Sequence, residues 1–171
     1  LVKTFFLGER GELSTSAYPM MKRFKSHKIT VSSLQDFANA LQRHAKLGHC
    51  VLKGKLNRDL DFEDRRGATS SLDATRWVCF DLDAAPFKTP DEFMGGHPLL
   101  KDVSYIVQYS ASEGFGKPGL RCHIFMLLDT KYNVSYLKSW LMSLNLDGKL
   151  WGGEVRRAIT LSNSRGALHW P

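Results

Sequence analysis

The stretch from Arg76 to Asp83, which reads Arg-Trp-Val-Cys-Phe-Asp-Leu-Asp, is an apolar run that ends in two acids one residue apart. Side chains alternate between the two faces of a strand, so Asp81 and Asp83 are expected on one face. Val78, Phe80 and Leu82 point to the other face and can anchor the strand in a core. The stretch therefore predicts a buried strand that holds two carboxylates on a rigid element.

Two unpaired carboxylates held this close repel each other. A hard divalent cation such as Mg²⁺ relieves the repulsion, because it takes oxygen ligands and often bridges to substrate phosphates. The Asp81 and Asp83 pair therefore indicates a metal site. The alternative is a strand that simply ends in a polar turn, since Ala84, Ala85 and Pro86 follow.

Length and composition predict one well-packed domain, because 171 residues with 43% hydrophobic content can bury a sizeable core. No apolar run reaches the length of a membrane span, and the opening residues turn polar too soon for a signal peptide. We expect a soluble protein of the cytoplasm.

Of the three cysteines, Cys79 and Cys122 lie in apolar strand-like runs and are expected to be buried, reduced thiols. The chain does not begin with Met, which favours a fragment of a longer protein.

The positive charge of the chain is concentrated near its beginning. Residues 1 to 58 contain 11 Lys and Arg against 3 Asp and Glu, a balance of +8, and residues 59 to 171 contain 13 against 14, a balance of −1. A basic segment suits a polyanion, because each phosphate contact releases counterions. The densest cluster predicts a DNA-binding surface, with an ordinary solvated surface as the alternative; it comprises Lys22, Arg23, Lys25 and Lys28.

Apolar spacing predicts a mixture of helices and strands. A helix starts after a cap at Ser32, with Gln35 completing a capping box, and closes at Gly48. A second, short helix starts at Thr89 with Pro90 in its first turn. The further expected elements are strands at 50–56, 76–83 and 154–161, a hairpin of 105–110 with 120–128, and a helix over 133–144, with a polar loop over 57–75. This order predicts an α+β protein whose partly antiparallel sheet is backed by helices.

The second strand of that hairpin begins with Arg121 and His123 on one face. They follow a glycine-rich loop that contains Ser112 and Lys117, and Arg66 lies in the earlier polar loop. Arg, Lys, His and hydroxyl groups in such loops are typical phosphate ligands. A single strand histidine is more often structural, so a structural role for His123 stays open.

Three motifs together resemble the archaeo-eukaryotic primase superfamily, and most of all the primase-polymerase domains of phage and plasmid replication proteins. They are the strand ending in Asp81-Leu82-Asp83, the glycine-rich hairpin leading to His123, and the later Leu146-Asp147 pair. The resemblance implies that Asp81, Asp83 and Asp147 hold two divalent ions, Mg²⁺ or Mn²⁺. It also implies that His123 contacts the phosphates of the incoming nucleotide.

Two details of this sequence bear on its resemblance to the family motifs. The third motif is short, so Asp129 and Glu154 are alternatives to Asp147. Arg121 stands two positions before the histidine, where the family usually has a small residue. We expect Arg121, Lys117, Ser112 and Arg66 to offset the charge of a bound triphosphate.

The resemblance further implies an RRM-like catalytic sheet over 76–171 and a small, basic α/β module over 1–75, in one domain. The implied activity is template-directed nucleotidyl transfer, as a primase, a DNA polymerase or both, in replication of a mobile element. Expected partners are single-stranded or primed DNA, deoxynucleotides or ribonucleotides, and a helicase or helical module in the full-length protein. The expected location is the cytoplasm of a prokaryotic host that carries a phage, plasmid or integrated element.

Three other functions fit parts of the sequence. A haloacid-dehalogenase-type phosphatase also ends a strand in Asp-x-Asp, but Ala85 stands where Thr or Val is expected. A metal-dependent nuclease would use the same acids with water as the nucleophile. A non-catalytic nucleic-acid-binding module would use only the basic cluster.

Overall fold

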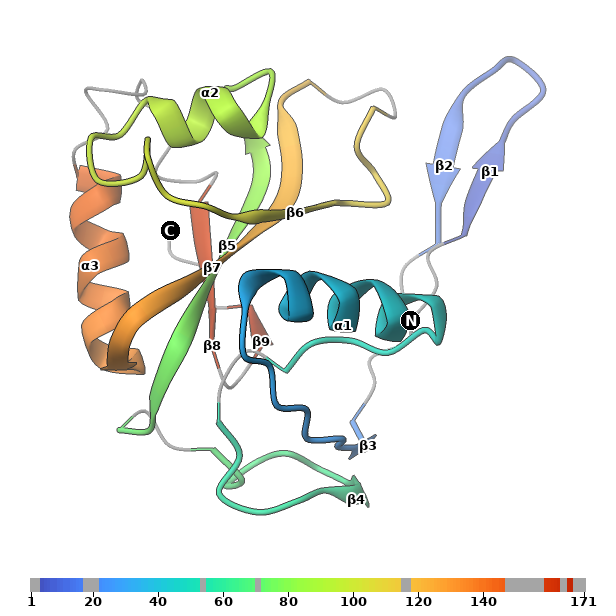
Figure 1. Cartoon of the computed structure of the whole chain (residues 1–171). Coiled ribbons are helices and arrows are strands. Elements are labelled where there is room, and N and C mark those ends of the chain that lie inside the picture. Colours follow the sequence, from blue (N-terminus) through green and yellow to red (C-terminus); the bar gives the residue numbers. More distant parts are fainter. Residues whose placement is uncertain are drawn as a thin grey trace.

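The computed structural model describes residues 4–16, 22–52, 55–69, 72–114, 118–146, 159–163 and 166–167. Within these ranges the chain forms antiparallel sheets and three helices (Figure 1). The α+β prediction is confirmed. The same ranges contain no helix that is long and apolar enough to cross a membrane.

The largest sheet has five strands in the order β6-β7-β5-β8-β9, and all neighbours run antiparallel. Its centre is formed by β5 (Ala74–Ala85) and β7 (Leu120–Asn133). The outer strands are β6 (Ile106–Tyr109), β8 (Ile159–Asn163) and β9 (Gly166–Ala167). The predicted hairpin is confirmed by the pairing of β6 with β7. The predicted last strand is confirmed from Ile159 onward, and its first part, 154–158, lies outside the described residues.

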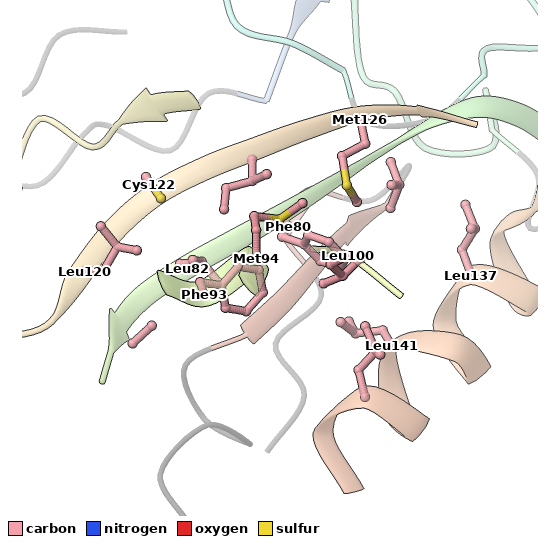
Figure 2. Packing of buried hydrophobic residues seen from close by; sticks show 14 residues of the cluster. Phe80, Leu82, Phe93, Met94, Leu100, Leu120, Cys122, Met126, Leu137 and Leu141 are labelled. Atoms are coloured by element: carbon pink, nitrogen blue, oxygen red, sulfur yellow. The ribbon is translucent and has the colours of Figure 1, made fainter. Parts of the chain in front are cut away.

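One face of this sheet carries the main hydrophobic core. It is covered by α2 (Pro90–Gly95), which starts at the predicted Thr89 cap, and by α3 (Val134–Leu146). Phe80 is fully buried, and its ring lies 5.8 Å from that of Phe93 and 5.6 Å from that of Trp140. Figure 2 shows the side chains of both strands meeting those of the helices. The alternate residues of β5 that were predicted to anchor the strand therefore do so.

The opposite face is covered at one end by α1 (Leu34–Lys46). The ring of Phe37 meets those of Trp77 and Phe125 edge-on, each at 5.7 Å between centroids. Leu41 and Cys79 complete this smaller cluster. Cys79 and Cys122 are both buried, as predicted. Burial is the larger cause and the charge of nearby Glu113 the next of a raised pKa of about 12 for the Cys122 thiol.

The start of α1 differs from the prediction by one residue. The N-cap is Ser33, whose Oγ accepts a hydrogen bond from the Asp36 N–H at 3.0 Å. Ser32 instead donates its hydroxyl and its N–H to the Asp36 carboxylate, and these bonds lower the pKa of Asp36. The predicted capping box with Gln35 is wrong, because Gln35 donates to the Asn39 side chain. Asp36, three residues after the true cap, instead accepts from Ser32, the residue just before the cap.

Two small antiparallel pairs precede the central sheet in the chain. The hairpin of β1 (Phe5–Leu7) and β2 (Leu13–Thr15) stands away from that sheet (Figure 1), and β3 (Phe24–Lys25) pairs with β4 (Asp61–Glu63). The predicted strand over 50–56 is wrong for its described residues, among which only Leu56 makes an isolated bridge, to Thr69. The pairing partner of β3 comes instead from the stretch predicted as a loop.

Candidate functional site

The register of β5 and β7 places Asp81 directly opposite His123. Directly paired residues of an antiparallel sheet share a face, so both side chains lie on the face that α1 covers only in part. His123 Nε2 is 3.3 Å from Asp81 Oδ1, and the two side chains are 32% and 26% exposed. The structure thus brings one of the two strand acids, Asp81, into contact with His123.

A β-bulge follows this pair. Leu82 faces Cys122 and Ala85 faces Leu120, so Asp83 and Ala84 together oppose the single residue Arg121. Ala84 has φ of +62°, a conformation that costs a non-glycine residue about 1–2 kcal/mol. Bulges of this kind change the direction of a side chain. Here Asp83 Oδ1 comes to 3.2 Å from Arg121 Nε.

Arg121 is held by the loop that joins β6 to β7. Its Nη1 donates to the carbonyl oxygens of Pro118 at 3.2 Å and Gly119 at 3.3 Å, and its backbone N–H donates to Glu113 Oε2 at 2.5 Å. The side chain is only 10% exposed, whereas that of Asp83 is 78% exposed. A buried guanidinium needs such partners, because its desolvation is costly. Arg121 is therefore anchored in the loop and contacts the exposed Asp83 carboxylate across the bulge.

Asp81, Asp83, Arg121 and His123 form a compact group, which we call the polar cluster. It joins two carboxylates on β5 to a guanidinium and an imidazole on β7. The carboxylates are the oxygen donors that Mg²⁺ and Mn²⁺ prefer, so they fit one hard divalent ion. Within the described part of the chain, no group of three or more His, Cys, Asp or Glu side chains is placed to hold a metal.

The third acid predicted from the sequence is not described. Asp147 and its alternative Glu154 lie outside the described residues. The other alternative, Asp129, lies six residues beyond His123 on β7, toward the start of β5, a separation of about 20 Å along an extended strand. This separation places Asp129 at the wrong end of β7 to join the two strand acids.

The remaining predicted phosphate ligands differ in their positions. Ser112 lies beside the polar cluster, since its Oγ is 3.0 Å from that of Ser110, whose N–H donates to the Arg121 carbonyl. Lys117 lies outside the described residues. Arg66 pairs with Asp64 at 3.4 Å within its own loop, between β4 and β5.

All four members of the predicted DNA-binding cluster are exposed, and one of them has an acidic partner. Lys22, Arg23 and Lys28 are exposed, but Lys25 Nζ is 3.1 Å from Asp61 Oδ1 across the β3–β4 pair. Its charge is thus offset by an acid that arrives from a distant part of the sequence. Both side chains of this pair are largely exposed, so water screens the contact and the role of Lys25 in DNA binding stays a prediction.

Sequence reasoning missed Phe62 in β4. Its side chain is 63% exposed, and its φ is +58°, a strained value for an aromatic residue. The acids on either side are paired, Asp61 with Lys25 and Glu63 with Arg58 at 2.5 Å. An exposed ring with neutralised acids beside it can stack on a flat partner. Its exposure and its backbone angle identify it, and the sequence carries neither signal.

No family model, no curated protein and no solved structure that was compared matches this chain.

The bulge generates a testable expectation at Gly119. An added Cβ there would lie 2.8 Å from the Ala84 carbonyl carbon, whereas at Gly114 it would meet nothing within 4 Å; both glycines have positive φ, +91° and +75°. Gly114→Ala should therefore cost about 1–2 kcal/mol of unfolding free energy from the backbone alone. Gly119→Ala should cost more, because β5 must move at the bulge. Urea denaturation of both variants measures this, and equal costs would show that the close approach of Gly119 to Ala84 does not matter.

Proposed function

We propose that this chain is a primase-polymerase domain that carries out template-directed nucleotidyl transfer on DNA. The observation that carries the proposal is the polar cluster. Asp81 and Asp83 project from one face of the central strand, beside His123 and close to a glycine-rich loop. Carboxylates that can bind metal ions, next to an arginine and a histidine that can bind phosphates, suit nucleotidyl transfer.

The strand order supports an RRM-like catalytic part. The chain runs β5-α2-β6-β7-α3-β8, the sheet order is β6-β7-β5-β8, and residues of both helices pack on the same face. This arrangement of two interleaved β-α-β units leaves the other face for a ligand. The segment over 1–75 is proposed as an appended module, and its helix α1 packs on that other face through Phe37.

Asp81 and Asp83 would hold the divalent ions, together with Asp147 as the proposed third acid. Bound Mg²⁺ or Mn²⁺ would supply activation of a primer 3′-hydroxyl and stabilisation of the leaving pyrophosphate. Arg121 would orient the Asp83 carboxylate through their 3.2 Å contact until an ion binds. His123 lies at the same surface as Asp81, where its imidazole can donate to a nucleotide phosphate.

The exposed β3–β4 region is proposed to contact single-stranded template. Lys22, Arg23 and Lys28 would contact phosphates. Phe62 would stack on a base, since every base offers a flat face to an exposed aromatic ring. The proposed substrates are deoxynucleotides or ribonucleotides on a primed or single-stranded template, in a prokaryotic cell that carries a mobile element.

A non-catalytic nucleic-acid-binding module is the second candidate. The observation that favours it is that both strand acids have a basic partner within the protein, Asp81 with His123 and Asp83 with Arg121. Acids satisfied in this way need no metal. An activity measurement on matched acid variants separates the two candidates.

Asp81→Asn and Asp83→Asn should each lower incorporation of labelled nucleotide on a primed template about 100-fold or more, because a neutral amide is a poor metal ligand. The amide oxygen still accepts hydrogen bonds, which limits the loss of stability. Asp102→Asn, an exposed acid in the α2–β6 connection, is the matched control and should keep full activity. Thermal melts check that all variants fold. Wild-type rates in either cluster variant, or no incorporation by the wild type with Mg²⁺ or Mn²⁺, would reject the proposed activity.

Replacing Lys22, Arg23 and Lys28 by Gln should flatten the salt dependence of single-stranded DNA affinity. The slope of log affinity against log salt should fall by up to about 0.7 for each phosphate that the variant no longer binds. Lys88, Lys101 and Lys131, replaced by Gln, provide a control with the same change of net charge on exposed side chains. Fluorescence anisotropy over a salt series gives both slopes. Equal slopes would place the template elsewhere, with Arg156, Arg157 and Arg165 as the next residues to replace.

Phe62→Ala should weaken single-stranded DNA binding by about 5- to 150-fold and leave the salt slope unchanged, because stacking of a base is worth about 1–3 kcal/mol and involves no counterions. Phe62→Trp keeps an aromatic ring and should retain affinity, with its fluorescence quenched on binding. Tyr136→Ala, which removes another exposed ring on α3, is the control. If Phe62→Ala binds like the wild type, the ring takes no part in the template contact.

A further inference from the structure

The end of α1 brings two histidines together. Gly48 has φ of +71°, its N–H donates to the Ala45 carbonyl at 2.9 Å, and the His49 N–H donates to the His44 carbonyl at 3.0 Å. These two bonds define a Schellman motif, in which the residue after the glycine folds back onto the last turn of the helix. The side chains at the positions of His44 and His49 in such a motif usually make an apolar contact. In this chain both side chains are imidazoles.

The two imidazole rings meet through the same kind of nitrogen. His44 Nδ1 is 2.9 Å from His49 Nδ1, and the ring centroids are 5.2 Å apart. When one ring carries its proton on Nδ1, that nitrogen donates a hydrogen bond to the other Nδ1. When neither Nδ1 carries a proton, the two lone pairs face each other and a cation can bind between them. Burial and then the charge of Arg43 lower the pKa of His44.

A third histidine packs on the pair from another segment. The ring of His27, which follows β3, stacks on that of His49 with centroids 5.6 Å apart and an angle of 12° between the planes. This contact covers one side of His49 and limits rotation of its ring. The negative end of the α1 dipole, at the last carbonyls of the helix, favours a cation here. The side chains of Arg43 and Lys46, in the same last turn, oppose it.

We propose that His44 and His49 form a binding site for a divalent transition metal, with Nδ1 of each ring as a ligand. With metal–nitrogen bonds of about 2.0–2.1 Å, two nitrogens 2.9 Å apart subtend an angle of about 90° at the metal. That angle matches adjacent positions of the square-planar or tetragonal geometry of Cu²⁺ and Ni²⁺. Water fills the other positions, since the described residues place no third His, Cys, Asp or Glu for such a group.

This site is separate from the polar cluster in place and in chemistry. The imidazoles lie at the end of a helix and are borderline ligands, whereas Asp81 and Asp83 lie on β5 and are hard oxygen ligands. Nucleotidyl transfer does not depend on the histidine pair, and metal binding at the pair does not depend on nucleotidyl transfer.

The test is titration of the purified chain, free of any affinity tag, with Cu²⁺ alone. Calorimetry measures the affinity, and electron paramagnetic resonance shows how many nitrogens bind the metal. All proteins carry Cys50→Ser, so that the exposed thiol beside His49 neither binds nor reduces the metal. The parent should bind one equivalent with splitting from two nitrogens. His44→Gln and His49→Gln should each lower affinity at least about tenfold and leave one nitrogen. His169→Gln, which removes one histidine elsewhere in the sequence, should leave affinity and splitting unchanged.

Gly48→Ala adds a test of geometry, because it keeps both histidines but strains the positive φ that joins them. It should weaken Cu²⁺ binding and broaden the spectrum, while circular dichroism reports whether α1 remains. Binding that is equal in the parent and in both histidine variants would overturn the proposal. So would the absence of saturable binding by the parent, or two-nitrogen splitting that survives in His49→Gln.

Discussion

The antiparallel pairing of β5 with β7 is the interaction on which the rest of the structure depends. It is the longest pairing among the described strands, and both of its faces are used. On one face, alternate residues of the two strands bury against α2 and α3; on the other, Trp77 and Phe125 bury against α1. Because side chains alternate, a slip of one residue would exchange these faces and bury Asp81 and His123. The core therefore fixes the register, and the register assembles the polar cluster.

The elements with strong local signals could be predicted from the sequence. The buried strand, the β6–β7 hairpin and the three helices each show apolar spacing with a clear start or stop, and each is found close to its expected range. The failures involve pairing between distant segments. Cys50–Leu56 has strand-like composition but no neighbouring strand for its described residues, whereas the polar Asp61–Glu63 becomes a strand because β3 lies beside it. Composition cannot supply a partner 36 or more residues away in the chain.

The members of the candidate site could also be predicted, but not their contacts. Alternation alone places Asp81 with Asp83 and Arg121 with His123. It does not reveal the bulge at Ala84, which requires a positive φ and the close approach of Gly119. That bulge brings the Asp83 carboxylate to Arg121. Arg121, which stands where the resembled family usually has a small residue, therefore orients Asp83 in the free protein. Of the three acids considered for the third motif, strand distance disfavours Asp129, and Asp147 and Glu154 lie outside the described residues.

The ion pairs of the polar cluster bear directly on how it would accept a cation. Asp83 is largely exposed, so its contact with Arg121 is screened by water and its carboxylate can turn toward a ligand at small cost. Asp81 is more enclosed and shares an oxygen with His123. A divalent ion attracts that oxygen more strongly than the imidazole does, since it carries two charges. The contacts that satisfy the acids in the free protein thus also hold them on one face, which reduces the rearrangement that binding would require.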